Sequence, residues 1–286
     1  MKKNYYPVDK RFLRCVVIIA NRQIVKDLEP RKNWYSEVAD AYNKARPRYP
    51  KELICRAVEL AQLTSDAIIL EVGCGSGNAT ITFAQLGFSM LCLEPSQELS
   101  QLALKNCVQY PDVEIRNTSF EEWELATEKF DAVLAANAMH WIPREIGYPK
   151  AAEALQDNGS LILLWNMTPQ PRYEVYQALN QVYQTQAPSL ARYEDRVTQL
   201  DILKGFGQNV IDSGRFKGLV SEQLTCEVTY SIDDYLTLLR TLSPYIVLDP
   251  QNRDSLFEGL REALERNCGR SIQTSYLSAF HIAQKV

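Results

Sequence analysis

The chain has 286 residues, of which 46% are hydrophobic and 23% charged, with 12 glycines and 13 prolines. This composition is typical of a globular protein with a large core, and it excludes disordered, collagen-like and disulfide-scaffold classes. The 31 Lys and Arg residues against 35 Asp and Glu give a net charge of −4, which leaves no basic excess for a nucleic-acid backbone, so we expect no nucleic-acid partner.

An apolar run at residues 15–20 follows several basic residues near the start of the chain. It is far shorter than the ~20 residues that span a bilayer, so we expect no membrane partner. The run continues directly into Asn21-Arg22-Gln23 without a small-residue cleavage site, which disfavours a secretory signal. We interpret residues 1–33 as an N-terminal extension and residues 34–286 as the functional domain.

From residue 67 onward, short apolar runs alternate with helical patterns. The predicted strands are residues 67–72, 89–93, 113–116, 130–137 and 159–165, and the predicted helices are residues 79–86, 96–109 and 145–156. Ser96 is a suitable N-cap, and Asp157-Asn158-Gly159 is a typical helix stop. Strands that lack polar alternation and are separated by helices predict a parallel sheet covered on both faces.

Beyond residue 165 the pattern changes to longer helices and two further strands. The helices are predicted at residues 172–185, 232–242 and 255–267, and the strands at residues 224–230 and 276–283. These strands bring the sheet to seven, and the helices between them are expected over its edge. The domain therefore divides into a core at residues 67–167 and a helical cap with the last strands at residues 168–286.

The turn after the first strand reads Glu71-Val72-Gly73-Cys74-Gly75-Ser76-Gly77-Asn78. Glycines here allow the backbone to approach a ligand and leave helix N-terminal amides facing it. A dinucleotide fold uses G-x-G-x-x-G to hold a pyrophosphate, but the third glycine here comes one residue earlier, and an acid stands two residues before the first. Such an acid disfavours a pyrophosphate and suits a positively charged head, such as the ammonium and sulfonium of S-adenosylmethionine.

Glu94 follows the second strand, about 20 residues beyond the first glycine of the turn, which is the position from which a carboxylate accepts hydrogen bonds from ribose hydroxyls. Together with Glu71, it favours a nucleoside ligand without phosphates. The alternative is an ordinary strand-to-helix turn that binds no ligand.

Three further segments carry a resemblance to a known family. They are AYNKARPRYP at residues 41–50, FDAV at 130–133 followed by AMHW at 138–141, and LLWN at 163–166. With the glycine turn, they make residues 34–167 resemble class I S-adenosylmethionine-dependent methyltransferases, in a methyltransferase type 11 subgroup related to trans-aconitate methyltransferases. The resemblance implies a Rossmann-like, doubly wound α/β sheet with an antiparallel last strand, an N-terminal helical lid and a C-terminal helical insertion. It also implies methyl transfer from S-adenosylmethionine to a small-molecule acceptor.

The resemblance further implies a cofactor site built from the glycine turn and the ends of the second, third and fourth strands. Its residues are Glu71, Gly73, Cys74, Gly75, Gly77, Glu94, Pro95, Leu99, Ser119, Phe120 and Asn137. Relatives often have an aspartate at the position of Ser119, where it accepts a hydrogen bond from the adenine amino group. We therefore expect a weaker contact here, or one made through water.

The candidate acceptor site lies around His140, after the fourth strand. Its other expected residues are Tyr42, Arg46, Trp141, Asn166 and Arg240. A carboxylate acceptor needs His140 only to orient it, whereas a phenol or amine needs His140 as a base, with a rate that rises through a pKa near 6–7. The alternatives are a structural histidine, a surface helix at residues 42–46, and a solvated charge at Arg240.

The cysteines and histidines bear on location and metal binding. Seven scattered cysteines without a CxxC pair are typical of reduced thiols, which predicts a cytoplasmic protein. Two histidines and no ligand cluster predict no metal site. Two rival functions share the fold, namely a nicotinamide-dependent oxidoreductase and a cofactor-binding module without catalysis.

Overall fold

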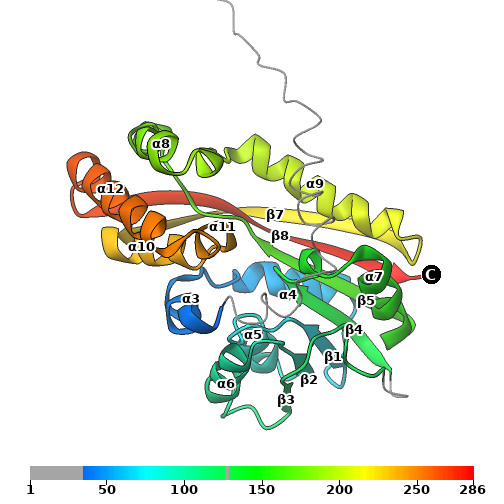
Figure 1. Ribbon diagram of the computed structural model, residues 1–286. Coiled ribbons are helices and arrows are strands. Elements are labelled where there is room, and N and C mark those ends of the chain that lie inside the picture. The colour runs from blue at the N-terminus through cyan, green and yellow to red at the C-terminus, as the bar shows by residue number, and fades with distance from the viewer. Residues whose placement is uncertain (1–34, 126–128) are drawn as a thin grey trace, which may run out of the picture.

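The structure of the protein is a computed structural model that describes residues 35–125 and 129–286 (Figure 1). The extension proposed at residues 1–33 lies outside the described residues. The strands are β1 (Ile68–Val72), β2 (Ser89–Leu93), β3 (Val113–Arg116), β4 (Phe130–Ala136), β5 (Leu155–Asn166), β6 (Gln170–Pro171), β7 (Phe216–Ser231) and β8 (Ser271–Lys285). The helices are α3 (Ala39–Ala45), α4 (Lys51–Leu60), α5 (Thr80–Gln85), α6 (Gln97–Asn106), α7 (Arg144–Ala154), α8 (Tyr173–Gln186), α9 (Arg196–Asp212), α10 (Ile232–Arg240), α11 (Ser243–Ile246) and α12 (Pro250–Cys268).

The strands form one sheet in the order β3-β2-β1-β4-β5-β8-β6, with β7 also paired to β8. The first five strands are parallel, and β8 runs antiparallel to β5, β6 and β7. The predicted doubly wound, mostly parallel sheet with an antiparallel last strand is therefore confirmed. The described chain has eight strands instead of seven, because the two-residue β6 pairs with β8 and is too short to leave a hydrophobic pattern.

Helices cover the sheet on both faces. One core contains residues of α4, α5 and α6 against β1, β2, β4 and β5, and the other contains residues of α7 and α9 on the opposite face. Helix α9 has no counterpart in the predicted elements because Gly205 and Gly207 weaken its helical pattern. Gly207 is needed for packing, since a Cβ there would lie 2.9 Å from Cδ2 of His281 on β8.

A third core builds a cap beside the sheet. It unites α8, α10, α11 and α12 with Ala45 at the end of α3 (Figure 1). The cap and the segment at residues 35–50 lie over the carboxyl ends of the parallel strands, as the lining of the cavity described below shows. Over residues 35–125 and 129–286, no helix has the length and apolarity needed to cross a membrane.

Candidate functional site

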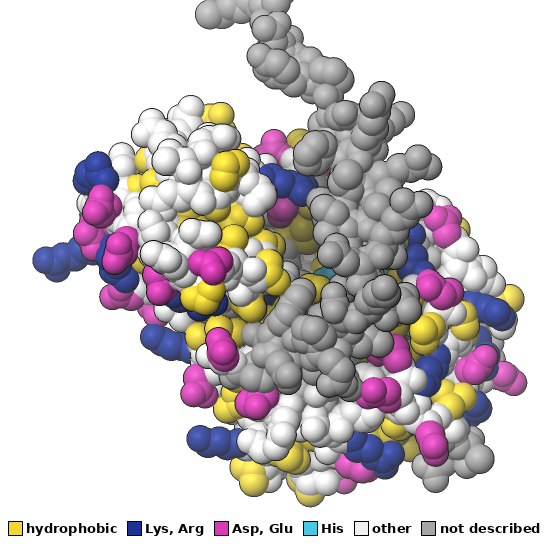
Figure 2. All heavy atoms as spheres, in the orientation of Figure 1, with side chains coloured by type: hydrophobic (Ala, Val, Ile, Leu, Met, Phe, Trp, Pro, Cys, Tyr) yellow, Lys and Arg dark blue, Asp and Glu magenta, His cyan; other side chains and the backbone are white. Residues whose placement is uncertain are grey.

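A cavity of about 410 Å³ lies at the carboxyl ends of β1, β2, β4 and β5. Ligands of open α/β sheets bind at this edge, where the strand order reverses, here between β1 and β4. Figure 2 shows hydrophobic side chains gathered around a hollow between the cap and the sheet domain. Of the residues that the structure describes, those that line it are Tyr35, Tyr42, Arg46, Val72, Gly73, Gly75, Glu94, Pro95, Ser96, Leu99, Ser119, Phe120, Glu121, Glu122, Ala136, Asn137, Ala138, His140, Trp141, Ile142, Asn166, Thr168, Leu242, Ser243 and Pro244.

The glycine turn forms the floor of this cavity. Gly73 and Gly75 have positive φ angles of 68° and 59°, and both line the cavity. A Cβ on Gly73 would lie 2.8 Å from Cβ of Ala138, so only glycine fits at that position. Gly77 does not line the cavity; it packs against α6, where a Cβ would lie 3.2 Å from the Cys107 sulfur. Cys74 lines a side cavity of about 40 Å³ instead.

Glu94 joins the end of β2 to this turn. Its Oε2 accepts a hydrogen bond from the Gly75 amide at 2.8 Å, and its Oε1 accepts one from the Ser96 amide at 2.9 Å. Burial raises the pKa of Glu94 to about 7, and these two backbone hydrogen bonds oppose the rise. Each carboxylate oxygen keeps a second lone pair, so both can accept from a ligand that lies in the cavity.

Glu71 differs from its expected role, because it does not line the cavity. Successive side chains of a strand point to opposite faces, and Glu71 points to the face that α5 covers. There its Oε2 accepts a hydrogen bond from Thr80 at 2.6 Å, while its buried Oε1 has no partner among the described residues. Desolvation raises the pKa of Glu71 to about 7, and the nearby charge of Glu94 adds to the rise.

The turn after β3 supplies another part of the cavity wall. Ser119 and Phe120 of this turn line the cavity, as do Pro95 and Leu99 after β2. Ser119 donates a hydrogen bond to Oε2 of Glu122 at 2.9 Å and accepts one from the Glu122 amide. Lys150 on α7 fixes this turn by donating to the carbonyls of Glu121 and Trp123.

Asn137 ties the ends of β4 and β5 to the segment before α4. Its Oδ1 accepts from the Tyr49 hydroxyl at 2.6 Å and from the Asn166 amide at 2.7 Å. Asn166 in turn donates from Nδ2 to the carbonyl of Pro47 at 2.9 Å. Asn137 has a φ of 51°, a strained conformation that these contacts stabilise. Both asparagines line the cavity and also hold its walls together.

His140 and Trp141 form an aromatic wall. The His140 ring lies 4.9 Å from that of Trp141 and 5.6 Å from that of Trp165, measured between centroids. The ring is exposed toward the cavity, yet the enclosing protein desolvates it, and this together with the charge of Arg46 lowers the pKa of His140 to about 4. The ring is therefore neutral at pH 7, and a rate that rises through pKa 6–7 is no longer expected from it.

The lid is the segment at residues 35–50, which contains α3. It places Tyr42 and Arg46 in the cavity wall. The Tyr42 ring lies over Gly75, 3.7 Å from where its Cβ would be, and the Arg46 guanidinium lies 4.8 Å from the centre of that ring. Arg240 was expected in the same site, but it does not line the cavity. It stacks on Phe257 at 4.1 Å and pairs with Asp254, because the helical turn directs it to the outer side of the cap.

Several wall residues were absent from the predicted set. They are Tyr35, Val72, Ser96, Glu121, Glu122, Ala136, Ala138, Ile142, Thr168 and the cap segment Leu242-Ser243-Pro244. Most of them lie in loops, where no periodicity marks a side chain that faces a ligand. Among the residues that the structure describes, no group of three or more His, Cys, Asp or Glu is placed to hold a metal ion.

Comparisons with known proteins agree with this geometry. Residues 69–159 match the sequence profile of a family described as a methyltransferase domain. An uncharacterized methyltransferase of Mycobacterium tuberculosis is 29% identical over 132 residues, which are 46% of this chain and 51% of the relative. The match thus spans about half of that relative. An uncharacterized methyltransferase of Schizosaccharomyces pombe is 23% identical over 235 residues, 82% of this chain and 88% of the relative.

Solved structures share the fold. A protein of Anaeromyxobacter dehalogenans described as a type II methyltransferase superimposes with a TM-score of 0.62 at 20% identity, covering 84% of this chain and 97% of that one. The narrower resemblance to trans-aconitate methyltransferases stays a prediction. The glycine turn, Glu94 at the cavity and the methyltransferase domain matched over residues 69–159 together support a class I S-adenosylmethionine-dependent methyltransferase.

Proposed function

We propose that this protein transfers a methyl group from S-adenosylmethionine to a small-molecule acceptor that carries a carboxylate. The observation that carries the proposal is one cavity of about 410 Å³ that joins the glycine turn and Glu94 to Arg46, His140 and Trp141. A cavity of this size suits one or two small ligands.

The walls fit the cofactor of the family. Gly73 and Gly75 give a backbone cradle, Glu94 offers acceptors for ribose hydroxyls, and Leu99 and Phe120 give apolar surface for a base. When bound, S-adenosylmethionine supplies a methyl group on a sulfonium. The acceptor oxygen forms a bond to that methyl carbon as the carbon–sulfur bond breaks, and the electron pair stays on sulfur.

The charges on the cavity wall support a carboxylate acceptor. Glu94, Glu121 and Glu122 lie at the β2–β3 end, whereas Arg46 lies on the lid. A guanidinium matches a carboxylate through paired hydrogen bonds. A carboxylate is already ionised at pH 7, so a neutral His140 serves only to orient it. The protein then contributes alignment and exclusion of water.

The test is transfer of labelled methyl to panels of small carboxylic acids, phenols and amines. We expect labelled product from a carboxylic acid, loss of that activity in Arg46→Ala, and retention in Arg240→Ala, the matched arginine outside the cavity. Labelling of phenols or amines alone would contradict the carboxylate assignment, and no labelling of any small molecule would contradict the function.

We also propose a cytoplasmic location, supported by the free thiols of the six cysteines that the structure describes.

A further inference from the structure

Arg46 on the lid and Thr241 on the cap are joined by two hydrogen bonds across 195 residues of sequence. Nε of Arg46 donates to Oγ1 of Thr241 at 3.0 Å, and Nη2 donates to the Thr241 carbonyl at 2.7 Å. Two bonds from different nitrogens fix both the position and the rotation of a planar guanidinium. Thr241 thereby sets the direction in which Arg46 presents its remaining donors.

The Thr241 hydroxyl is itself held in one orientation. It is fully buried at the end of α10, and its single hydrogen is donated to the carbonyl of Leu238 at 2.7 Å. A hydroxyl has only one hydrogen, so toward Arg46 the oxygen acts solely as an acceptor. The contact is therefore one-directional and does not exchange between donor and acceptor forms.

The third nitrogen of the guanidinium stays available. Within residues 35–125 and 129–286, Nη1 of Arg46 has no hydrogen-bond partner, and Arg46 lines the main cavity. Thr241 does not line it, although the next three residues do. Thr241 is thus placed to act on a ligand through Arg46 and not by contact.

We propose that Thr241 is a positioning residue of the acceptor site, which holds Arg46 so that its Nη1 edge faces an anionic oxygen of the acceptor. This inference rests on the proposed function and extends it. Recognition of the acceptor anion then depends on a cap residue that does not contact the acceptor.

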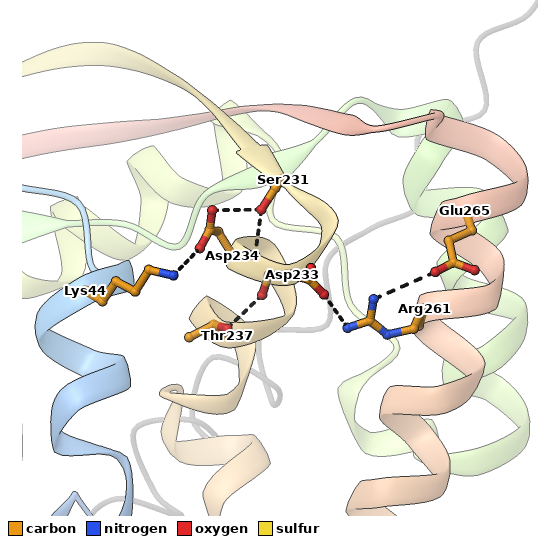
Figure 3. A network of polar contacts seen from close by, with 7 residues as sticks. All are labelled: Lys44, Ser231, Asp233, Asp234, Thr237, Arg261 and Glu265. Carbon is orange, nitrogen blue, oxygen red and sulfur yellow. Dashed lines mark hydrogen bonds and ion pairs between the residues drawn. The ribbon is translucent and has the colours of Figure 1, made fainter.

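Ion pairs on the surface also join α10 to the lid and to α12, but they are less able to fix the orientation of the Arg46 guanidinium. Figure 3 shows Lys44 of the lid paired with Asp234 of α10 at 2.8 Å, and Asp233 of α10 paired with Arg261 of α12 at 2.6 Å. The Lys44 and Asp234 side chains are 71% and 40% exposed, and exposed pairs of long side chains contribute little. The contact with the buried Thr241 is the one that fixes Arg46.

The test uses the ¹⁵N–¹H signal of Arg46 Nε in the full-length protein with S-adenosylhomocysteine present. The signal is assigned by its loss in Arg46→Lys. The probe is sodium acetate, with sodium chloride at equal ionic strength as the control. In the wild type we expect acetate to shift the signal. In Thr241→Val we expect the acetate concentration that gives half of the maximal shift to be about tenfold higher. A tenfold change in affinity corresponds to the free energy of about one hydrogen bond to a charged group.

Two variants separate positioning from stability. Thr241→Ser keeps the hydroxyl and should restore the wild-type response. Thr237→Val removes a hydroxyl that also donates to a helix carbonyl of α10, at Asp233, but does not contact Arg46, and it should leave the response unchanged. Thr241→Ala replaces the valine variant if valine prevents folding. In turnover of a labelled carboxylic acid, Thr241→Val should raise KM about tenfold with kcat within about twofold.

The inference is overturned if acetate does not shift the Arg46 signal of the wild type, or if a folded Thr241→Val variant responds within twofold of it. The signal requires no turnover. A failure to label any acceptor would count against the proposed function, and it would leave the response of Arg46 to acetate as a separate result.

Discussion

The carboxylate of Glu94 accepts a hydrogen bond from the backbone amide of Gly75 at 2.8 Å, so the acid after β2 holds the turn after β1 in place. This contact makes Glu94 both a wall of the cavity and a support of its floor. Its removal should weaken cofactor binding in two ways, by loss of an acceptor and by release of the turn.

We expect Glu94→Ala to lose about 1.5–3 kcal/mol of binding free energy for S-adenosylhomocysteine, the range for hydrogen bonds to a charged group. Titration calorimetry measures the loss, with circular dichroism to establish folding. Glu98→Ala, an exposed acid on the first turn of α6, is the matched control and should bind as the wild type does. An unchanged Kd in a folded Glu94→Ala variant would remove the ribose role.

The raised pKa of Glu71 predicts that the free energy of unfolding depends on pH. Its pKa in the folded protein is about 7, above its ordinary value of 4.5, because it is desolvated. The folded state therefore binds more protons than the unfolded state between these values, and stability falls as pH rises from about 4.5 to about 7. Glu71→Gln imitates the protonated form, so its stability relative to the wild type should increase between pH 5 and pH 7.5. Urea denaturation at both pH values checks this; a constant difference would contradict it.

Because the pKa of His140 is lowered, we predict that this residue adds no inflection to the pH profile of kcat/KM near neutral pH. Since its pKa is lowered to about 4, the ring does not titrate between pH 6 and pH 8. The kcat/KM profiles of the wild type and His140→Gln should therefore run parallel over this range, with the variant lower if the ring orients the acceptor. An inflection near pH 6–7 that His140→Gln abolishes would show that the histidine acts as a base with an ordinary pKa.

The two glycines of α9 predict opposite effects of the same substitution. A Cβ on Gly207 would lie 2.9 Å from the His281 ring, whereas a Cβ on Gly205 would meet no atom within 4 Å. Gly207→Ala should cost about 1–3 kcal/mol of unfolding free energy through overpacking. Gly205→Ala should stabilise the protein by about 0.5–1 kcal/mol through helix propensity. Chemical denaturation of both variants measures the contrast, and equal effects would show that Gly207 is not a packing constraint.

Local patterns sufficed for the elements that carry the cofactor site. Strands β2 and β3 begin and end where the apolar runs predict, and Glu94, Gly73 and Gly75 line the cavity because they stand where strands end. The same pattern misplaced Glu71. It lies within β1, and the alternation of the strand turns its side chain toward α5 instead of the cavity.

Contacts between distant parts of the chain could not be predicted in this way. Arg240 and Thr241 are neighbours in sequence, yet Arg240 lies on the outer side of the cap and Thr241 binds Arg46. Only the packing of α10 against α3 decides which of the two faces inward. Tyr35 was missed for a local reason, since it lines the cavity but no periodic pattern surrounds it.

The most direct test of the account is calorimetric titration of the protein with S-adenosylmethionine, S-adenosylhomocysteine and NAD, in the wild type and in Gly75→Val. Gly75 has a φ of 59° beneath Tyr42, so a branched side chain is strained there and enters the cavity floor. We predict that the wild type binds both S-adenosyl ligands and not NAD, and that Gly75→Val remains folded but loses this binding. Equal or tighter binding of NAD, or an S-adenosyl affinity within twofold of the wild type in Gly75→Val, would contradict the account.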